Sequence, residues 1–432
     1  MRHPRKHPLA YALVLCLALA AGLGPTVFNF VVDPYDRNGW FDLGIEKASL
    51  SEKAHYPLWK MLRYSAKSPS LIVLGDSRAR ALRDKYWHEA GRTDAFNFAY
   101  GGATVQEIHE TFEYVKANPD IDTLIVGIQL RSFDLDHKGG MNRVPEAIEL
   151  TEGAFNYYTS WFVAKIGWRH VATEFELDPA TWALTWPSLI GSAQAAGRGA
   201  NDRLTLFDLL SPEACLGCEL PEVQQTAFTV GPGVNLGLGR GYGAWSRLWP
   251  AINLDRDLPA KFARQVERNA RSDWRSFNFS EELWLKLNEI SVWSRENNVE
   301  LVFVIPPTIS EMQERITEFG FGILNHDFRL RLAELAPVVD FDFDNALTRD
   351  ISRFSDAYHF NAAASREIVG ELVMFTGSDE KAQVRLRSNR GSLRCPVFTD
   401  DTTDRLSDGR VVMKQGVGCR IWSKEGAQHD IR

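Results

Sequence analysis

Three side chains in this sequence have the types and spacing needed to break or transfer an ester bond. Ser77 lies in a Gly-Asp-Ser-Arg segment at residues 75–78, and Asp356 precedes His359 by three positions near the other end of the chain. A nucleophilic serine needs a base to take its proton, and that base needs a carboxylate to fix its tautomer. We therefore predict Ser77 as nucleophile, His359 as general base and Asp356 as its orienting acid. This chemistry requires no cofactor and no metal ion.

Residues beside these three are candidates for holding a substrate. Gly101 and Gly102 end a predicted strand, where their amides can point toward the negative charge that develops on a carbonyl oxygen. A plain turn is the alternative for this glycine pair. Arg78 and Arg80 follow the serine directly, and two interpretations stay open for them. They hold a carboxylate or phosphate of the substrate, or they lie exposed on the next helix.

The elements that must position these residues alternate along the chain. Short apolar runs predict five strands, at residues 70–74, 95–99, 122–128, 300–305 and 338–343. Helical spacing predicts helices at residues 82–90, from Thr104 onward, and at 281–298, 325–335 and 362–375. Strands that alternate with helices fold as a parallel sheet with helices on both faces, and such sheets bind ligands at the carboxyl ends of their strands. The serine and glycine segments fall at such ends, and the Asp-x-x-His segment lies just before the last helix.

This combination of motifs resembles the SGNH hydrolase superfamily, also called GDSL-type esterases. Its members carry a Gly-Asp-Ser block near the start and an Asp-x-x-His block near the end, and the resemblance covers residues 70–134 and 300–376. It implies an α/β fold of three layers with a flavodoxin-like parallel sheet of five strands. It also implies that the amides of Ser77 and Gly102 are two oxyanion donors.

One departure from the family concerns the third oxyanion donor. Members usually carry Gly-x-Asn-Asp after the third strand, whereas this chain has Gly-Ile-Gln-Leu at residues 127–130, so Gln129 is the side chain that can supply an equivalent amide. This variant block, an N-terminal apolar segment and Pro306-Pro307 resemble the membrane-anchored SGNH-like proteins of bacterial cell-surface polysaccharide O-acetylation. The resemblance implies a polysaccharide or glycan substrate, acetyl as the transferred group, and a membrane protein that donates acyl groups.

The N-terminus predicts export. Three basic residues precede an uncharged run from Leu9 to Val32, which is long enough to span a bilayer with its basic flank in the cytoplasm. An uncleaved signal anchor gives a single-pass protein of the inner membrane with a periplasmic or extracytoplasmic catalytic domain. A signal peptide cleaved near Ala18-Leu19-Ala20 gives a protein secreted to the periplasm, and both interpretations stay open. The net charge of −7, with no basic cluster beyond the N-terminus, argues against a nucleic-acid partner.

Composition and the alternation of predicted strands and helices divide the chain into segments. Residues 1–32 form the anchor or signal peptide, 33–68 a polar juxtamembrane segment, and 69–377 the hydrolase-like domain. An insertion at residues 135–280, predicted to be a partly helical cap, interrupts that domain. Residues 378–432 form a small C-terminal module.

Cysteine usage agrees with export. Four cysteines outside the apolar run form two local pairs, which favours two disulfides, Cys215 with Cys218 and Cys395 with Cys419, in an oxidising compartment. A zinc site made of both pairs is the alternative. No histidine lies at ligand spacing beside either pair, so the disulfides are preferred.

Two hypotheses follow from these observations. The first is an exported serine esterase or O-acyltransferase that acts on acyl groups of a cell-envelope or extracellular polysaccharide through an acyl-Ser77 intermediate. Water as acceptor makes it an esterase, and a sugar hydroxyl makes it a transferase. The second is a non-catalytic glycan-binding scaffold of a polysaccharide export or modification machine, on the same fold. The missing asparagine favours the scaffold, whereas the presence of Ser77, Asp356 and His359 opposes it.

Overall fold

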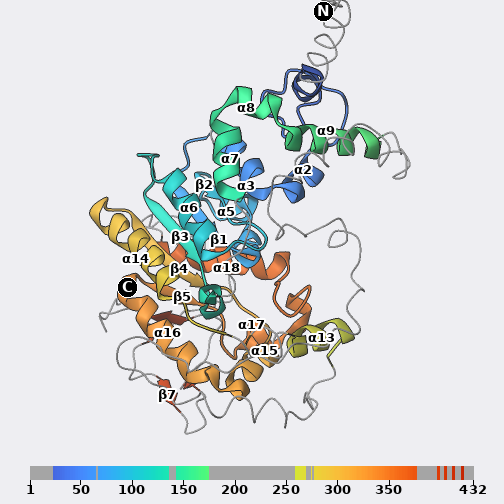
Figure 1. The fold of residues 1–432 in the computed structure, drawn as a ribbon. Helices are drawn as coiled ribbons and strands as arrows, with labels where there is room; N and C mark the ends of the chain where they lie inside the picture. Colours follow the sequence, from blue (N-terminus) through green and yellow to red (C-terminus); the bar gives the residue numbers. More distant parts are fainter. Residues whose placement is uncertain are drawn as a thin grey trace, which may run out of the picture. The chain divides into compact units, whose positions relative to one another are not determined.

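The computed structural model describes residues 23–64, 67–135, 143–174, 258–268, 274 and 277–376, together with four short strands between 397 and 422. The chain divides into two compact units. The first contains residues 1–62 and 146–226, and the second contains residues 63–145 and 227–432. The second unit holds the sheet and all the predicted catalytic, oxyanion and arginine residues (Figure 1).

A parallel sheet of five strands forms the centre of the second unit. In spatial order the strands are β2 (Ala95–Asn97), β1 (Leu71–Gly75), β3 (Thr123–Gly127), β4 (Glu300–Ile305) and β5 (Val338–Asp340). Apart from Glu300, every residue of these strands is buried, which explains why they read as continuous apolar runs. The order 2-1-3-4-5 is that of flavodoxin-like sheets. The predicted α/β class and parallel sheet are confirmed.

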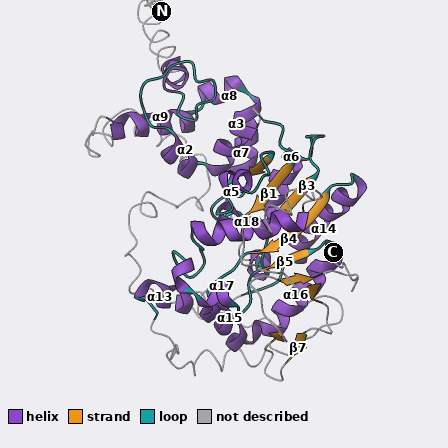
Figure 2. Cartoon of the chain, turned by 180° about the vertical axis from the view of Figure 1, so that it is seen from behind, coloured by secondary structure: helices purple, strands orange, loops and turns teal. Residues whose placement is uncertain are grey.

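Helices cover both faces of this sheet. On one face, α6 (Val105–Val115) packs against β1 and against α14 (Glu281–Glu296). On the other, α18 (Ala362–Thr376) packs against α5 (Asp84–Glu89). Figure 1 shows α6 and α14 in front of the strands, and Figure 2, seen from behind, shows α18 lying across them. The remaining described helices of this unit are α4 (Ser77–Arg80), α13 (Ala260–Arg268), α15 (Ser310–Ile316), α16 (Gly322–Leu335) and α17 (Ala346–Arg349), with short 3-10 turns at Leu130–Phe133 and Ile351–Arg353 and a π turn at Thr317–Phe321.

Two strands end earlier than the sequence predicts, and in both a polar side chain binds the backbone just after the strand. In β2, the side chain of Asn97 accepts a hydrogen bond from the amide of Ala99 at 2.8 Å. After β5, the carboxylate of Asp340 accepts one from the amide of Asp342, also at 2.8 Å. The amides of Phe98 and Tyr100 still donate to the carbonyls of Val73 and Gly75 in β1.

The predicted C-terminal module contributes to the sheet as well. β9 (Arg420–Trp422) pairs antiparallel with β5, and β6 (Val397–Phe398) pairs with β9. β7 (Thr403–Arg405) and β8 (Val411–Met413) form a separate antiparallel pair. Since an unpaired edge strand leaves its backbone groups unsatisfied, β9 provides β5 with a partner. The four cysteines of the two predicted disulfides lie outside the described residues.

The first unit is helical in its described part. It contains a helix at residues 23–32, α2 (Ala48–Ala54), α8 (Ala154–Thr159), α9 (Trp161–Glu174) and most of α3 (Tyr56–Tyr64) and α7 (Arg143–Glu152). The predicted juxtamembrane segment and the beginning of the insertion therefore fold together, and Ser51 Oγ of α2 lies 2.7 Å from Nε2 of His170 of α9. Among the described residues no helix has the length and apolarity to span a bilayer. Residues 1–22, which hold most of the predicted anchor, lie outside them.

Candidate active site

A continuous series of hydrogen bonds joins Ser77 to His359 and His359 to Asp356. The hydroxyl oxygen of Ser77 lies 2.8 Å from Nε2 of His359, although the two residues are 282 positions apart in the chain. The second ring nitrogen, Nδ1, lies 2.9 and 3.0 Å from the two carboxylate oxygens of Asp356. A carboxylate at Nδ1 fixes the proton there and leaves Nε2 free to accept one from the serine. The arrangement is therefore able to deprotonate the Ser77 hydroxyl.

The carboxylate of Asp356 is held in its ionised form. Burial alone would raise its pKa, but the hydrogen bond from His359 and the amides of Tyr358 and His359 outweigh this, so that the pKa falls from 3.8 to about 2. The side chain of Asp356 is 16% exposed and that of His359 is 37% exposed. The acid is thus screened from water, while the base remains accessible to a substrate.

Two glycines on neighbouring strands make room for the short helix that begins with Ser77. Gly75 and Gly127 are register partners of β1 and β3, and both lie beneath Ala79 of α4. A Cβ atom at either glycine would lie 2.6 Å from the Cβ of Ala79. Gly75 also has a φ of +141°, a conformation that other residues rarely adopt. The missing side chains allow α4, which begins with Ser77, to lie directly on the sheet.

Polar contacts fix both ends of this short helix. At its start, Asp76 accepts a hydrogen bond from the amide of Arg78 at 2.9 Å and pairs with the Arg78 guanidinium at 3.1 Å. Burial would raise the pKa of Asp76, but the charge and amide of Arg78 outweigh it and lower the pKa. At its end, the side-chain amide of Asn97 donates to the carbonyls of Ala79 and Leu82 at 2.8 and 2.6 Å. These contacts limit how far Ser77 can move.

The two predicted arginines do not lie free on the helix surface. The side chain of Arg78 is only 3% exposed and binds Asp76, so the interpretation of an exposed surface arginine is wrong for this residue. Its charge stabilises the turn before the serine. Arg80 is half-buried.

The backbone amides predicted as oxyanion donors are available. Within the described part of the chain, neither the amide of Ser77 nor that of Gly102 donates a hydrogen bond. Gly102 has a φ of +68°, and a Cβ atom built on it would meet nothing within 4 Å. The glycine therefore borders open space in a left-handed conformation that few other residues adopt. This supports a loop built to approach a ligand.

A buried ion pair holds the glycine loop in place. The guanidinium of Arg143 donates to both carboxylate oxygens of Glu107, at 2.7 and 2.8 Å, and to the carbonyls of Gly101 and Gly102 at 3.3 and 3.1 Å. Glu107 also closes the capping box of α6, because its carboxylate accepts from the amide of Thr104 at 3.0 Å. The predicted helix start at Thr104 is confirmed, and the loop before it is tied to two charged side chains.

Gln129 follows the strand beside that of the serine. Gly75 and Gly127 are register partners, and Ser77 and Gln129 each come two positions later in the chain. Gln129 is half-buried, and among the described residues its side-chain amide makes no hydrogen bond. Its side-chain amide is therefore available as a donor.

The loop that carries Asp356 and His359 is fixed by the insertion. Gln265 of α13 accepts a hydrogen bond from the amide of Ala357 at 2.9 Å. From the same helix, the ammonium group of Lys261 donates to the carbonyl of Ser355 at 3.1 Å and lies 3.9 Å from the carboxylate of Asp356. The insertion thus contributes to the candidate site, which its sequence did not indicate.

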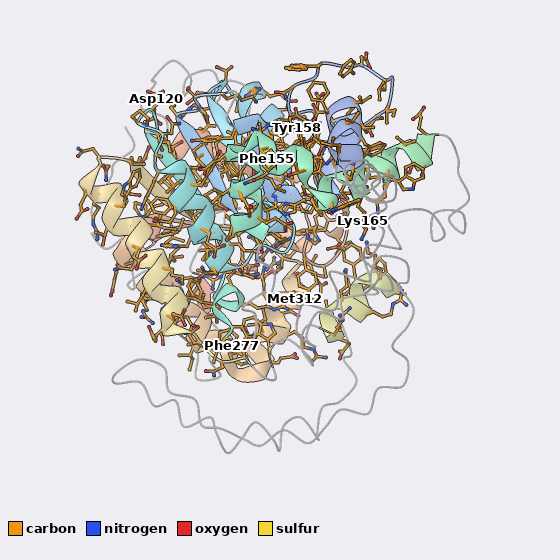
Figure 3. All side chains as sticks on the ribbon, turned by 45° about the horizontal axis from the view of Figure 1, so that its top comes forward. Asp120, Phe155, Tyr158, Lys165, Phe277 and Met312 are labelled. Carbon is orange, nitrogen blue, oxygen red and sulfur yellow. The ribbon has the colours of Figure 1, made fainter. Side chains whose placement is uncertain are left out.

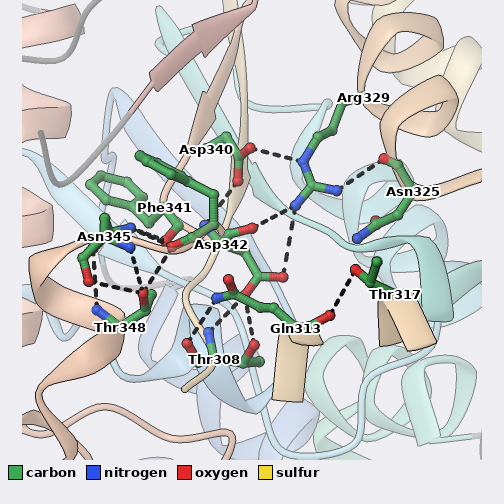
Figure 4. Close-up of polar contacts among 11 residues, drawn as sticks. Thr308, Gln313, Thr317, Asn325, Arg329, Asp340, Phe341, Asp342, Asn345 and Thr348 are labelled. Carbon is green, nitrogen blue, oxygen red and sulfur yellow. Dashed lines mark hydrogen bonds and ion pairs between the residues drawn. The ribbon is translucent and has the colours of Figure 1, made fainter. Parts of the chain in front are cut away.

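A buried polar network supports the same loop from the sheet side (Figure 4). Asp342 accepts from the amide and the hydroxyl of Thr308, at 2.8 and 2.6 Å, and Arg329 bridges Asp340 and the carbonyl of Asp342, both at 2.8 Å. The amide of Ile309 then donates to the carbonyl of Ala357 at 3.3 Å. The ends of β4 and β5 are in this way connected to the histidine loop.

Several positioning residues were not predicted from the sequence. Glu107 stands three residues after Thr104, and this capping-box spacing is the signal that identifies it. Arg143, Lys261, Gln265 and Asp342 have no local signal, because each meets its partner only in the folded chain. No protein-family model matches this chain, and a search of curated proteins finds no match.

Proposed function

We propose that this chain is an SGNH-type serine esterase or O-acyltransferase that acts through an acyl-Ser77 intermediate. The observation that carries the proposal is the row of hydrogen bonds from Ser77 through His359 to Asp356. The strand order and the position of the serine directly after β1 support the resemblance to that superfamily.

In the first half-reaction, Oγ of Ser77 attacks the carbonyl carbon of an acyl ester while Nε2 of His359 takes its proton. Asp356, ionised at neutral pH, stabilises the positive imidazolium that results. The tetrahedral intermediate then collapses, and the bond to the leaving alcohol breaks as His359 returns the proton to that oxygen. The acyl group remains on Ser77.

Negative charge on the former carbonyl oxygen is met by the amides of Ser77 and Gly102, which are unoccupied within the described residues. The Gln129 side chain is the third donor in this proposal. Removing one such donor typically lowers kcat by about a hundred- to a thousandfold. Gln129→Leu is therefore expected to lower the rate by this order while leaving KM nearly unchanged.

In the second half-reaction, His359 deprotonates the acceptor, which attacks the carbonyl carbon of the acyl-serine. The bond to Oγ of Ser77 then breaks as His359 returns the proton to that oxygen. Water as acceptor gives ester hydrolysis, and a sugar hydroxyl gives O-acylation of a glycan. We propose acetyl as the acyl group, an envelope or extracellular polysaccharide as the substrate, and an anchored or secreted site outside the cytoplasm. In the transferase case a membrane protein supplies the acyl groups. These assignments rest on the N-terminal apolar run and on the family resemblance.

A fluorophosphonate probe tests the nucleophile, because it labels only a serine that is activated by a base. We expect the full-length protein in detergent to be labelled at Ser77, and labelling to be lost in Ser77→Ala and His359→Ala. His109→Ala is the matched control, since His109 also pairs with a carboxylate, Glu289 at 2.7 Å, but between α6 and α14. Equal labelling of wild type and His359→Ala would refute a general-base role for this histidine.

The acceptor is tested with 4-nitrophenyl acetate, with and without a short glycan. Ser77-dependent release of nitrophenol that is unaffected by glycan indicates an esterase, whereas acetylated glycan indicates a transferase. The replacement of the usual asparagine by Gln129 favours a second candidate, a glycan-binding scaffold without catalysis. A folded wild type that releases no nitrophenol and resists the fluorophosphonate, yet binds glycan, would establish the scaffold instead.

A further inference from the structure

The first unit exposes an unusual amount of apolar side chain. Among the described residues, eight large hydrophobic side chains are strongly exposed, and six of them belong to this unit: Leu23, Val27, Trp40, Phe41, Leu43 and Phe155. Trp40 is 67% exposed and Phe155 is 78% exposed. Apolar side chains that gather on one part of a surface indicate a site for a partner or a membrane.

Five of these six side chains belong to one surface, whose centre is Phe30. The ring of Phe30 lies 4.9 Å from that of Trp40, 5.8 Å from Phe41 and 5.5 Å from Tyr158. On the helix at residues 23–32, Leu23 and Val27 lie one turn apart on the same face, and Phe30 follows on the next turn. Phe155 lies one turn before Tyr158 on α8, and both are labelled in Figure 3. We call this the aromatic surface: Leu23, Val27, Phe30, Trp40, Phe41, Phe155 and Tyr158.

The aromatic surface is presented by a well-bonded turn. The carboxylate of Asp33 accepts hydrogen bonds from the amides of Arg37, Asn38 and Gly39, at 3.0, 2.9 and 3.2 Å. It also accepts one from the hydroxyl of Tyr157 at 2.8 Å. These bonds fix the chain immediately before Trp40. The exposure of Trp40 and Phe41 is therefore a property of the folded unit.

We propose that the aromatic surface inserts into the interfacial layer of a lipid bilayer. The sequence carries no charge from Leu9 to Leu23, where the aromatic surface begins, so one apolar partner can cover both this run and the aromatic surface. Tryptophan, tyrosine and phenylalanine rings favour the boundary between headgroups and acyl chains. This inference does not depend on the chemistry at Ser77.

The charges around the aromatic surface indicate which lipids it contacts. Asp42 follows Phe41 directly, and the guanidinium of Arg37 is turned inward to the carbonyl of Leu150 at 2.7 Å. A surface that binds anionic headgroups needs several exposed basic side chains. Neither Asp42 nor the inward Arg37 offers an exposed positive charge to a headgroup, so we expect insertion by this surface to proceed with zwitterionic lipid alone.

Photocrosslinking of the full-length protein in phosphatidylcholine vesicles tests the proposal. Phe41, Phe155 and Leu285 are replaced one at a time by p-benzoyl-phenylalanine, and lipid adducts are measured by mass spectrometry. Leu285 is the matched control, since it is 60% exposed but belongs to the second unit. We expect several-fold more lipid adduct at positions 41 and 155 than at 285.

The other outcomes overturn the proposal. Adduct yields at 41 and 155 that do not exceed the yield at 285 would show that this surface does not enter the bilayer. A covalent protein dimer in place of lipid adducts would assign the surface to a second copy of the chain. Adducts that form only after phosphatidylglycerol is added would show that anionic headgroups, and not aromatic insertion, provide the attraction.

Discussion

Gly127→Ala is the perturbation that most directly tests how the sheet positions Ser77. The Cβ atom of an alanine at this position would lie 2.6 Å from the Cβ of Ala79, whereas ordinary contacts begin at 3.4 Å. The two atoms must therefore separate by about 0.8 Å. Because α4 contains only residues 77–80, a displacement of Ala79 carries Ser77 with it. The hydrogen bond of 2.8 Å to His359 would be stretched or misdirected.

The expected loss is large in rate and smaller in stability. A misplacement of about 1 Å at a reacting group can lower the rate by about a hundredfold. Overpacking of this kind lowers the free energy of unfolding by about 1–3 kcal/mol. We therefore expect kcat for 4-nitrophenyl acetate and the rate of fluorophosphonate labelling to fall together by about two orders of magnitude, in a protein that still unfolds cooperatively in denaturant.

A second substitution distinguishes this explanation from general damage. Ala79→Gly removes the atom that clashes, so the double variant Gly127→Ala, Ala79→Gly should recover most of the labelling rate. Gly153→Ala is a control in the first unit, where the atoms nearest to the new Cβ are those of the Asn156 side chain, at 2.9 to 3.2 Å. The reasoning is refuted if Gly127→Ala labels at the wild-type rate, or if the double variant is no faster than the single one.

Three further predictions concern the supports of the site. Arg143→Lys keeps a positive charge beside Glu107 but loses the planar guanidinium that binds the carbonyls of Gly101 and Gly102. Steady-state assays should therefore show kcat lower by about tenfold and an unchanged KM. The pKa of Asp356 is about 2 in the folded state and 3.8 in the unfolded chain, so this carboxylate contributes stability that is fully present above pH 3.8 and is lost as the pH falls toward 2. Denaturant titrations at several pH values should therefore show that the free energy of unfolding falls less steeply with acid in Asp356→Asn than in the wild type. Asp342→Ala leaves buried donors of Thr308 without partners and should lower the free energy of unfolding by about 1–3 kcal/mol, whereas Asp344→Ala, at an exposed ion pair, should lower it by less than about 1 kcal/mol.

The sheet was predictable because its strands are buried along their length, apart from Glu300 at the start of β4. Each appears in the sequence as a short apolar run, and the polar or glycine segments that follow mark the carboxyl ends. This is also why Ser77 and the glycine pair at residues 101–102 could be expected at one edge of the sheet, whereas the contact of Ser77 with His359, 282 positions away, was expected from the family resemblance. Parallel strands collect their carboxyl ends at one edge, so the topology supplies what local spacing cannot.

The supports of the site were not predictable, because they depend on pairs that only the tertiary structure creates. Gly127 carries no signal of its own until its neighbour on β1 and the methyl group of Ala79 are known. Arg143 lies 36 positions from Glu107, and Gln265 lies 92 positions from Ala357. Neither pair follows a helical or strand period. An exposed Arg78 was one of the two interpretations that the sequence left open, and it failed because the guanidinium pairs with Asp76 at the start of α4.

Ser77 and the His359 loop are held in place by different residues, and this predicts how the effects of substitutions at the two places combine. Ser77 is seated on the glycines of β1 and β3, whereas the His359 loop depends on Asp342 and α13. Gly127→Ala and Asp342→Ala share no contact, so their effects on the free energy of unfolding should add. Their effects on fluorophosphonate labelling should not add, because each breaks the same hydrogen bond between serine and histidine, and the second change has little left to remove. Additive losses of labelling rate would mean that at least one of the two substitutions acts on another part of the site.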